Sequence, residues 1–230
     1  MKKNFPLVFR KQFMQIEPGD YNDYISTLFP QYKLFLNSAA KTVIEHIKTL
    51  EQPKIVDLGC GTGNLEAELD KILPFNYPIR KVIRGIDNDW LALLYAGFRT
   101  EIKHTEWYWE NIPDFEFFSA QVYTSSLTLH HLNGNWEEAF EKIYRALPPG
   151  GIFVQTEMVK GETEAEQQKY SEQIKNNLEP RFNFEDWKKE SDQVDHFHTI
   201  GKELYLLCKL GFKVDIIQED PPFYQYLAQK

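Results

Sequence analysis

Short apolar runs alternate with segments of helical apolar spacing along the first 156 residues of the chain. The runs that predict strands fall at 55–56, 81–86, 105–109, 120–126 and 152–156. Between and before them, apolar residues recur at the three- and four-residue intervals typical of helices, over 31–50, 65–72, 90–99 and 136–147. Because strands joined by helices pair side by side in one direction, the pattern predicts an α/β domain with a mostly parallel sheet and helices on both faces.

This alternation stops at residue 157 and resumes at residue 200. Residues 157–198 contain 11 acidic and 6 basic side chains, and this composition predicts a helical or mobile insertion. The insertion is either a lid over a bound ligand or a charged helix exposed to solvent, and the sequence leaves both open. A helix over 200–210 and strands over 213–217 and 223–227 complete the pattern.

Length and composition fit a single large domain. The 230 residues, 42% of them hydrophobic, can bury a substantial core, and we divide them into an N-terminal cap with the first helix, 1–50, and an α/β domain, 51–230, that carries the insertion. The net charge of −8 makes a nucleic-acid partner unlikely. Two cysteines, Cys60 and Cys208, are too few for a disulfide framework and lack metal-site spacing. Without 18 consecutive apolar residues or a signal-peptide pattern, we expect a cytoplasmic protein with no membrane span. The oligomeric state does not follow from the sequence.

A glycine-rich segment at residues 54–64 carries the strongest signal. A short apolar strand ends at Asp57, and glycines follow at alternate positions, Gly59, Gly61 and Gly63. Glycine lacks a Cβ atom, so such a loop turns sharply and lets its backbone contact a ligand. The dinucleotide-binding pattern would need a glycine at position 64, where this chain has Asn64. The sequence therefore predicts a ligand-binding loop of a different kind.

Two other polar side chains fall where predicted strands end. Asp87 closes the strand at 81–86, and Ser126 closes the strand at 120–126. Asp89 is placed to cap the helix that follows. Ligands of parallel α/β sheets bind at the carboxyl ends of the strands, so we expect Asp87, Ser126 and the glycine loop to share one site.

The D-x-G-x-G-x-G loop resembles motif I of the class I S-adenosylmethionine-dependent methyltransferases. Further segments resemble the second motif of that family, its strand-four motif, its R-x-L-x-P-G-G turn and the segment before its sixth strand, at 85–88, 125–132, 145–151 and 209–212. The resemblance implies a Rossmann-like fold with a mostly parallel seven-stranded sheet and S-adenosyl-L-methionine as cofactor. It is strongest to the small-molecule branch of ubiquinone-type C-methyltransferases and carboxy-S-adenosylmethionine synthase, which has a P-x-Y sequence where this chain has Tyr32.

The resemblance also implies which residues bind the cofactor. Asp87 would accept hydrogen bonds from both ribose hydroxyls, and Asn88 would lie against the adenine. The full expected set is Tyr32, Asp57, Gly59, Cys60, Gly61, Gly63, Asp87, Asn88, Glu110, Asn111 and Ser126. Two places depart from the family pattern: Gln121 stands where an acid is common, and Glu110 and Asn111 replace a Gly-Asp pair.

The implied activity is methyl transfer to a small-molecule acceptor. Positioning can supply much of the rate, so no catalytic residue stands out, and the candidates are Tyr21, Tyr24, Trp187 and His196. Two alternatives stay open: a carboxy-S-adenosylmethionine synthase-like enzyme, for which Lys188 and Lys189 would supply a cation, and a cofactor-binding protein without catalysis.

The remaining histidines give no clear site in the sequence. His130 and His131 follow the fourth strand, where packing or surface roles are expected for them. His196 and His198 stand close to an acid, but the sequence places no third ligand beside them, so we expect no metal site.

Overall fold

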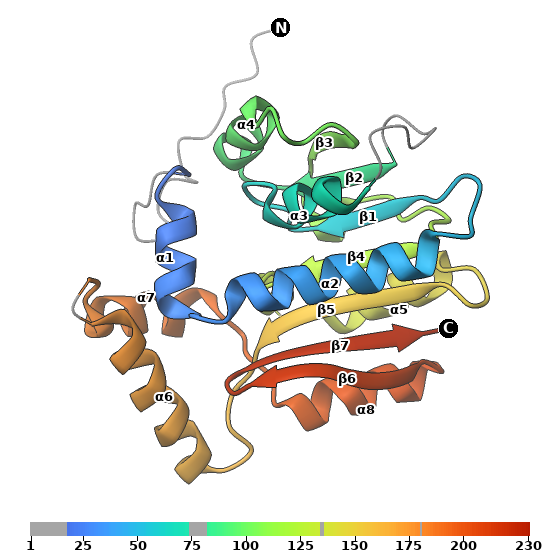
Figure 1. The fold of residues 1–230 in the computed structure, drawn as a ribbon. Helices are drawn as coiled ribbons and strands as arrows, with labels where there is room; N and C mark the ends of the chain where they lie inside the picture. The colour runs from blue at the N-terminus through green and yellow to red at the C-terminus, as the bar shows by residue number, and fades with distance from the viewer. Residues whose placement is uncertain (1–17, 74–81, 134–135, 180) are drawn as a thin grey trace, which may run out of the picture.

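A single seven-stranded sheet organises the protein (Figure 1). The computed structural model describes residues 18–73, 82–133, 136–179 and 181–230. The strands are β1 (Ile55–Leu58), β2 (Ile83–Asp87), β3 (Thr105–Trp109), β4 (Val122–Ser126), β5 (Ile152–Met158), β6 (Lys213–Asp220) and β7 (Phe223–Gln229), in the order β3-β2-β1-β4-β5-β7-β6. Pairing is parallel from β3 to β5, whereas β7 runs antiparallel to β5 and β6. The predicted mostly parallel α/β sheet is confirmed. Lys81, the expected start of the second strand, lies outside the described residues.

Eight helices surround this sheet in the described part of the chain. They are α1 (Tyr21–Leu28), α2 (Tyr32–Ile47), α3 (Asn64–Ile72), α4 (Trp90–Phe98), α5 (Trp136–Ala146), α6 (Glu164–Leu178), α7 (Phe184–Val194) and α8 (Ile200–Leu210), with short 3₁₀ turns η2 (Ile112–Asp114) and η3 (Leu129–His131). Asp89 caps α4 as predicted, since its Oδ1 accepts from the Leu91 and Ala92 amides. The sequence analysis missed α1. No helix of the described residues is long and apolar enough to cross a membrane.

Two apolar layers fix the helices on the sheet. On one face, α2 and α3 bury side chains such as Phe35 and Leu69 against Ile55 of β1 and Val154 of β5. On the other face, Phe140 of α5 packs in the layer that also contains α8 and the opposite side of the sheet. Alternation of side chains along each strand supplies both layers, because every central strand is buried on both sides.

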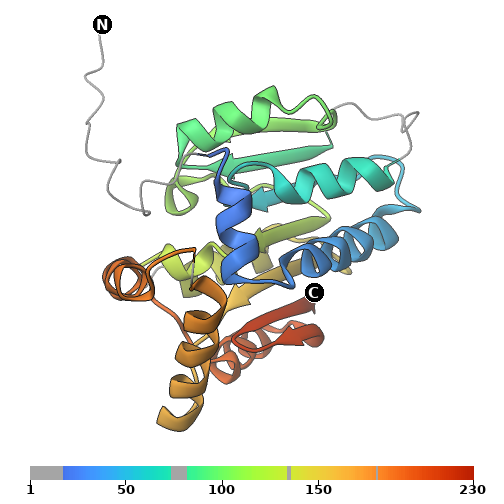
Figure 2. The same ribbon diagram turned by 60° about the vertical axis from the view of Figure 1, so that its left-hand side comes forward.

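Helices α1, α6 and α7 lie together beyond the carboxyl ends of the parallel strands (Figures 1 and 2). The Asn177 side chain in α6 donates a 3.1 Å hydrogen bond to the Leu28 carbonyl at the end of α1. The Tyr24 ring meets the Phe182 ring edge-on, with centroids 5.4 Å apart. The insertion also buries Ile174, Leu178 and Phe184, so it packs more apolar surface than its charged composition suggested. Helix α1 and the described part of the insertion therefore form one cover over this edge of the sheet.

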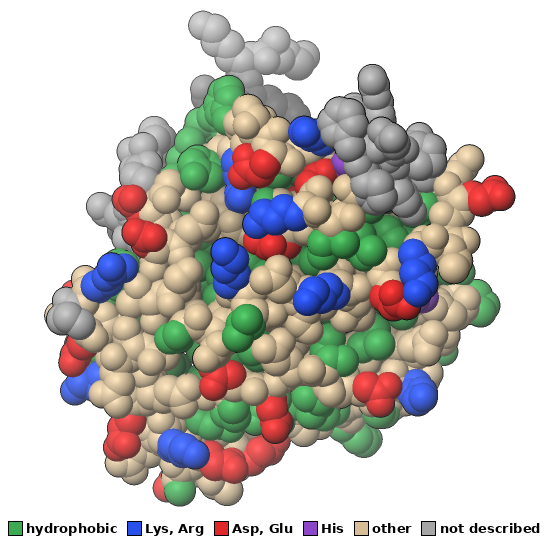
Figure 3. Space-filling view, in the orientation of Figure 1, with side chains coloured by type: hydrophobic (Ala, Val, Ile, Leu, Met, Phe, Trp, Pro, Cys, Tyr) green, Lys and Arg blue, Asp and Glu red, His purple; other side chains and the backbone are tan. Residues whose placement is uncertain are grey.

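Charge is dispersed over the face that carries α2. Figure 3 shows the described Lys and Arg side chains on this face separated from one another by acidic, apolar and uncharged polar groups. Basic and acidic side chains are therefore interspersed on this face.

Candidate functional site

The glycine loop between β1 and α3 leaves space on its outer side. Its three glycines all have positive φ, with Gly61 at 52°. The Gly59 and Cys60 amides donate to the Ile86 carbonyl at 2.8 and 3.1 Å, which holds the loop against β2. A Cβ atom built on Gly61 would meet no atom within 4 Å, whereas one on Gly59 would lie 2.1 Å from the Thr128 side chain. Gly59 is thus closely packed against Thr128, whereas the space beside Gly61 is open.

Asp87 stands directly beside this open space. Its Oδ2 accepts from the Gly61 amide at 2.8 Å, and its Oδ1 accepts from the Asp89 amide at 2.8 Å. Burial raises the pKa of Asp87 above its ordinary value, against the effect of these backbone hydrogen bonds. Each carboxylate oxygen keeps a further lone pair, so the group can accept two hydroxyl donors at once. The structure therefore brings together the two elements that the sequence analysis placed in one site.

A buried pair of carboxyl groups, Asp57 and Glu66, lies beneath the loop. Asp57 is 3% exposed and accepts a 2.7 Å hydrogen bond from the Thr124 hydroxyl, and Glu66 is fully buried. Burial, followed by the charge of Asp57, raises the pKa of Glu66 well above its ordinary value. Burial also raises the pKa of Asp57, to about 6. The two acids therefore lie close enough for their charges to interact, and the pKa of each is raised in the folded protein. The sequence analysis did not identify Glu66 as a site residue, because its position in the helical pattern indicates only that it lies on the buried face of α3.

A polar chain ties the N-terminal segment to the loop. Tyr32 is buried, and its hydroxyl lies 3.4 Å from the Asn64 side-chain amide. That amide also donates to Asn22 of α1 at 2.6 Å, and the Arg99 guanidinium donates to Asn64 Oδ1 and to the Thr62 carbonyl, both at 2.9 Å. Asn22 and Arg99 carried no signal in the sequence, since each meets the loop only through folding. They brace the first turn of α3, where the ligand space begins.

The other expected residues are spread around Asp87. The Glu110 amide donates to the Asp87 carbonyl at 3.0 Å, which places Glu110 next to the acid. Asn88 is exposed, and its carbonyl accepts from the Trp109 ring nitrogen at 2.9 Å. Asn111 uses its amide locally, on Asp114 at 3.1 Å. Ser126 ends β4 close to the Tyr32 hydroxyl. Gln121 lies at the opposite end of β4, where its side chain accepts from the Lys54 amide at 2.8 Å.

The cover contributes aromatic side chains to the same end of the sheet. Tyr21 is close enough to Asp87 that this charge adds to burial and to the neighbouring tyrosines in raising the pKa of Tyr21. One helical turn further, the Tyr24 hydroxyl is hydrogen-bonded to Trp187 and lies within reach of the Asp195 charge. Lys188 and Lys189 are exposed on α7. Of the candidate residues, Tyr21 therefore lies near Asp87, whereas Tyr24 and Trp187 contact each other within the cover.

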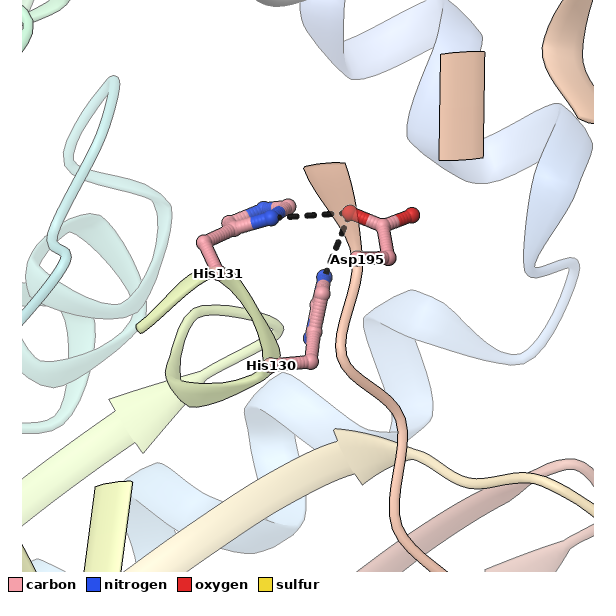
Figure 4. Close-up of side chains that lie close together, drawn as sticks. All are labelled: His130, His131 and Asp195. Carbon is pink, nitrogen blue, oxygen red and sulfur yellow. Dashed lines mark ion pairs between the residues drawn. The ribbon is translucent and has the colours of Figure 1, made fainter. Parts of the chain in front are cut away.

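A second polar cluster, formed by His130, His131 and Asp195, lies under the cover (Figure 4). His131 Nδ1 is 2.9 Å and His130 Nε2 is 3.9 Å from the same Asp195 oxygen. The fourth candidate, His196, donates its backbone amide to the His130 carbonyl at 2.7 Å, and the His198 ring packs edge-on against Trp136. Asp195 therefore pairs with the two histidines after β4 rather than with those beside it in sequence.

Comparison with known families identifies the central part of the chain. A family profile described as a methyltransferase domain matches residues 55–151, from β1 to the turn before β5. Among curated proteins, the chain is 29% identical over 145 residues to a carboxy-S-adenosyl-L-methionine synthase of Staphylococcus epidermidis, covering 63% of this chain and 61% of that protein. A protein of the same name from Campylobacter lari is 28% identical over 144 residues, covering 60% of this chain and 58% of that protein. The alignments thus span about three fifths of these relatives.

Solved structures extend the similarity to nearly the whole fold. The plantazolicin methyltransferase BpumL in complex with SAH superposes with a TM-score of 0.65 at 14% identity, covering 92% of this chain and 88% of that chain. The CurJ carbon methyltransferase superposes with a TM-score of 0.62 at 17% identity, covering 94% of this chain and 61% of that chain. At these identities the similarity establishes the fold, and the expected Rossmann-like architecture is confirmed.

Proposed function

We propose that the chain, which matches a methyltransferase-domain profile over residues 55–151 and has the fold of S-adenosylmethionine-dependent methyltransferases, transfers a methyl group from S-adenosyl-L-methionine to a small-molecule acceptor. The observation that carries this proposal is the pairing of Gly61 with Asp87: open space beside a glycine in the left-handed region, with a half-buried carboxylate hydrogen-bonded to the same glycine.

The residues around this space fit the cofactor. Burial disfavours the ionised form of Asp87, and two hydroxyl donors from a ribose would offset that penalty. Gly61 would let the backbone approach the ligand, and Glu110 and Asn88, which adjoin Asp87, would lie toward the adenine. Tyr32 and Ser126 would close the side nearest β4.

The cofactor supplies a methyl group on a positively charged sulfur, which is a good leaving group. The chain's own residues then have to orient the acceptor and exclude water, and such positioning can lower a barrier by about 7–11 kcal/mol. Tyr21, Tyr24 and Trp187 of the cover would provide aromatic side chains for this purpose. We therefore infer that the N-terminal segment and the insertion select the acceptor.

A carboxy-S-adenosylmethionine synthase-like activity is the second candidate, because the curated relatives described above carry that name. Such an enzyme must stabilise an additional carboxylate on its product. The lysines considered for this role, Lys188 and Lys189, are both exposed on α7, where solvent weakens their attraction for an anion. Methyl transfer is therefore the preferred proposal.

Calorimetry with S-adenosylhomocysteine and turnover assays test the proposal together. The protein should bind S-adenosylhomocysteine and convert S-adenosylmethionine to it in the presence of amine, carboxylate, phenol or thiol acceptors, with product masses read by mass spectrometry. A carboxylated cofactor as the product would establish the second candidate. Binding without turnover of either kind would indicate a non-catalytic cofactor-binding protein, and absence of binding would refute the proposal.

A further inference from the structure

The cluster of His130, His131 and Asp195 has the donor set of a metal centre. The η3 turn after β4 supplies both histidines, and the segment after α7 supplies the acid. One ligand atom from each residue lies within 4.8 Å of the other two, and both imidazoles point toward the same carboxylate oxygen (Figure 4). We propose that these three side chains bind a divalent metal ion, for which Zn²⁺ is the best match.

The observed separations suit a single ion. Nitrogen and oxygen ligands lie about 2.0–2.2 Å from Zn²⁺ in tetrahedral geometry, so neighbouring ligand atoms are roughly 3.4 Å apart. The distances from the Asp195 oxygen, 2.9 Å to His131 Nδ1 and 3.9 Å to His130 Nε2, lie on either side of that value. Small side-chain rotations would bring all three ligands into place. Three protein ligands leave a fourth position open, as in catalytic zinc sites.

A buried carboxylate favours the tautomer of His130 that can bind a metal ion through Nε2. The Nδ1 atom of His130 is hydrogen-bonded to Glu157, a residue that is only 1% exposed. Glu157 is itself held by the Gln155 side-chain amide at 3.1 Å and the Met158 backbone amide at 3.0 Å. A proton on Nδ1 leaves the lone pair on Nε2, which is the atom that faces Asp195. Metal-bound histidines commonly donate their second ring nitrogen to a carboxylate in this way.

Electrostatics favours a cation at the same point. Glu157 and Asp195 bring two carboxylates into the interior, with side-chain exposures of 2% and 7%. In the described part of the chain, the ion pairs made by these two groups are all with histidine, and none is with lysine or arginine. Buried carboxylates that stay ionised are paired with a cation or coordinate a metal ion, and a divalent ion would compensate both.

The position of the cluster suggests what the open coordination site would take. Tyr24 lies near Asp195, and Tyr21, on the same helix, lies near Asp87. Their ring centroids are 6.3 Å apart, so α1 links the cluster to the glycine-loop site in about one helical turn. An acceptor with an oxygen, nitrogen or sulfur donor could then bind the metal while it faces the methyl group. This role rests on the proposed function, whereas metal binding itself does not.

Metal binding can be measured without turnover. After chelator treatment, the full-length protein is dialysed against Zn²⁺ and its metal content determined, and Co²⁺ is titrated in parallel while the visible absorption of the cobalt site is recorded. We expect one equivalent of bound zinc and the intense visible bands of low-coordinate cobalt. His131→Ala, a change at a partly exposed position, and Asp195→Asn should each weaken zinc binding at least tenfold. Glu157→Gln should weaken it about 10–100-fold, as is typical when the carboxylate partner of a metal-bound histidine is lost.

His46→Ala is the matched control, because it removes a partly exposed imidazole from α2, away from the cluster. It should leave zinc affinity unchanged. Less than one tightly bound equivalent in the parent, or equal affinities in the parent and in correctly folded His131→Ala protein, would overturn the proposal. Calorimetry with S-adenosylhomocysteine on the same metal-free samples separates the two ideas: cofactor binding without zinc binding would refute the metal site and leave the proposed function intact.

Discussion

Replacing Gly61 by alanine should block the cofactor while leaving the fold intact. The added methyl group meets no protein atom within 4 Å, so the ligand-free protein has room for it. In the complex it would occupy the space where the loop backbone approaches the ligand. The substitution therefore separates a requirement of binding from a requirement of folding.

The Gly61→Ala substitution should have two effects, a loss of stability and a loss of cofactor affinity. The left-handed conformation at φ 52° penalises any residue with a Cβ by about 1–2 kcal/mol. For a domain of this size each kcal/mol lowers the melting temperature by about 2–4 °C. Steric exclusion of the cofactor comes in addition, and a tenfold loss of affinity corresponds to about 1.4 kcal/mol. We expect at least that loss.

Gly150→Ala supplies the matched control. Gly150 also has positive φ, 80°, and open space at its Cβ position, but it lies in the turn before β5. Calorimetric titration with S-adenosylhomocysteine and thermal unfolding should be run on both variants. Both should lose similar stability, and only Gly61→Ala should lose affinity. If Gly61→Ala binds as tightly as Gly150→Ala, the loop does not contact the ligand in the way argued here.

Three further outcomes are expected. Asp87→Ala removes the acceptor of two hydroxyl hydrogen bonds and should weaken S-adenosylhomocysteine at least tenfold in calorimetry; unchanged affinity would exclude Asp87 from the site. The pKa of Glu66 is raised well above 4.5 in the folded state, so the unfolded protein releases this proton at a lower pH than the folded protein does. From pH 5 to 7 the free energy of unfolding of the parent should therefore fall, relative to that of Glu66→Gln, by about 1.4 kcal/mol per pH unit. Denaturant titrations should show this slope, and Glu68→Gln, which removes an acid paired with Lys71 on the same helix, should not show it. Hydrogen exchange should slow on S-adenosylhomocysteine binding both in residues 157–198 and in the N-terminal segment through Tyr32. Protection confined to the glycine loop would indicate that residues of the sheet, rather than these two segments, select the acceptor.

Local chemistry was enough to predict the framework and half of the site. The periodicity of apolar residues located the strands and most helices, because burial on a sheet or helix face repeats at a fixed interval. The glycine loop and Asp87 could be predicted directly, since each directly follows an apolar strand in the sequence and the loop resembles motif I of a known family. The Asp89 cap was readable for the same reason: a cap and its helix are neighbours in sequence. Helix α1 was missed, because eight residues with three buried side chains give too weak a pattern.

Tertiary structure alone decided which distant groups meet. The fold brings Glu66 of α3 close enough to Asp57 of β1 for their charges to interact, and it brings Arg99, which follows α4, to Asn64 at the start of α3. Asp195 pairs with His130 and His131 rather than with His196, the histidine that follows it in sequence. The reason is that the His196 amide donates a hydrogen bond to the His130 carbonyl, which holds the backbone after α7 against η3. Such contacts depend on the path of the chain between residues far apart in sequence, and composition or spacing carries no record of that path. The sequence determined the fold and the cofactor loop, whereas the charges beneath the loop and the ligands under the cover were set by packing.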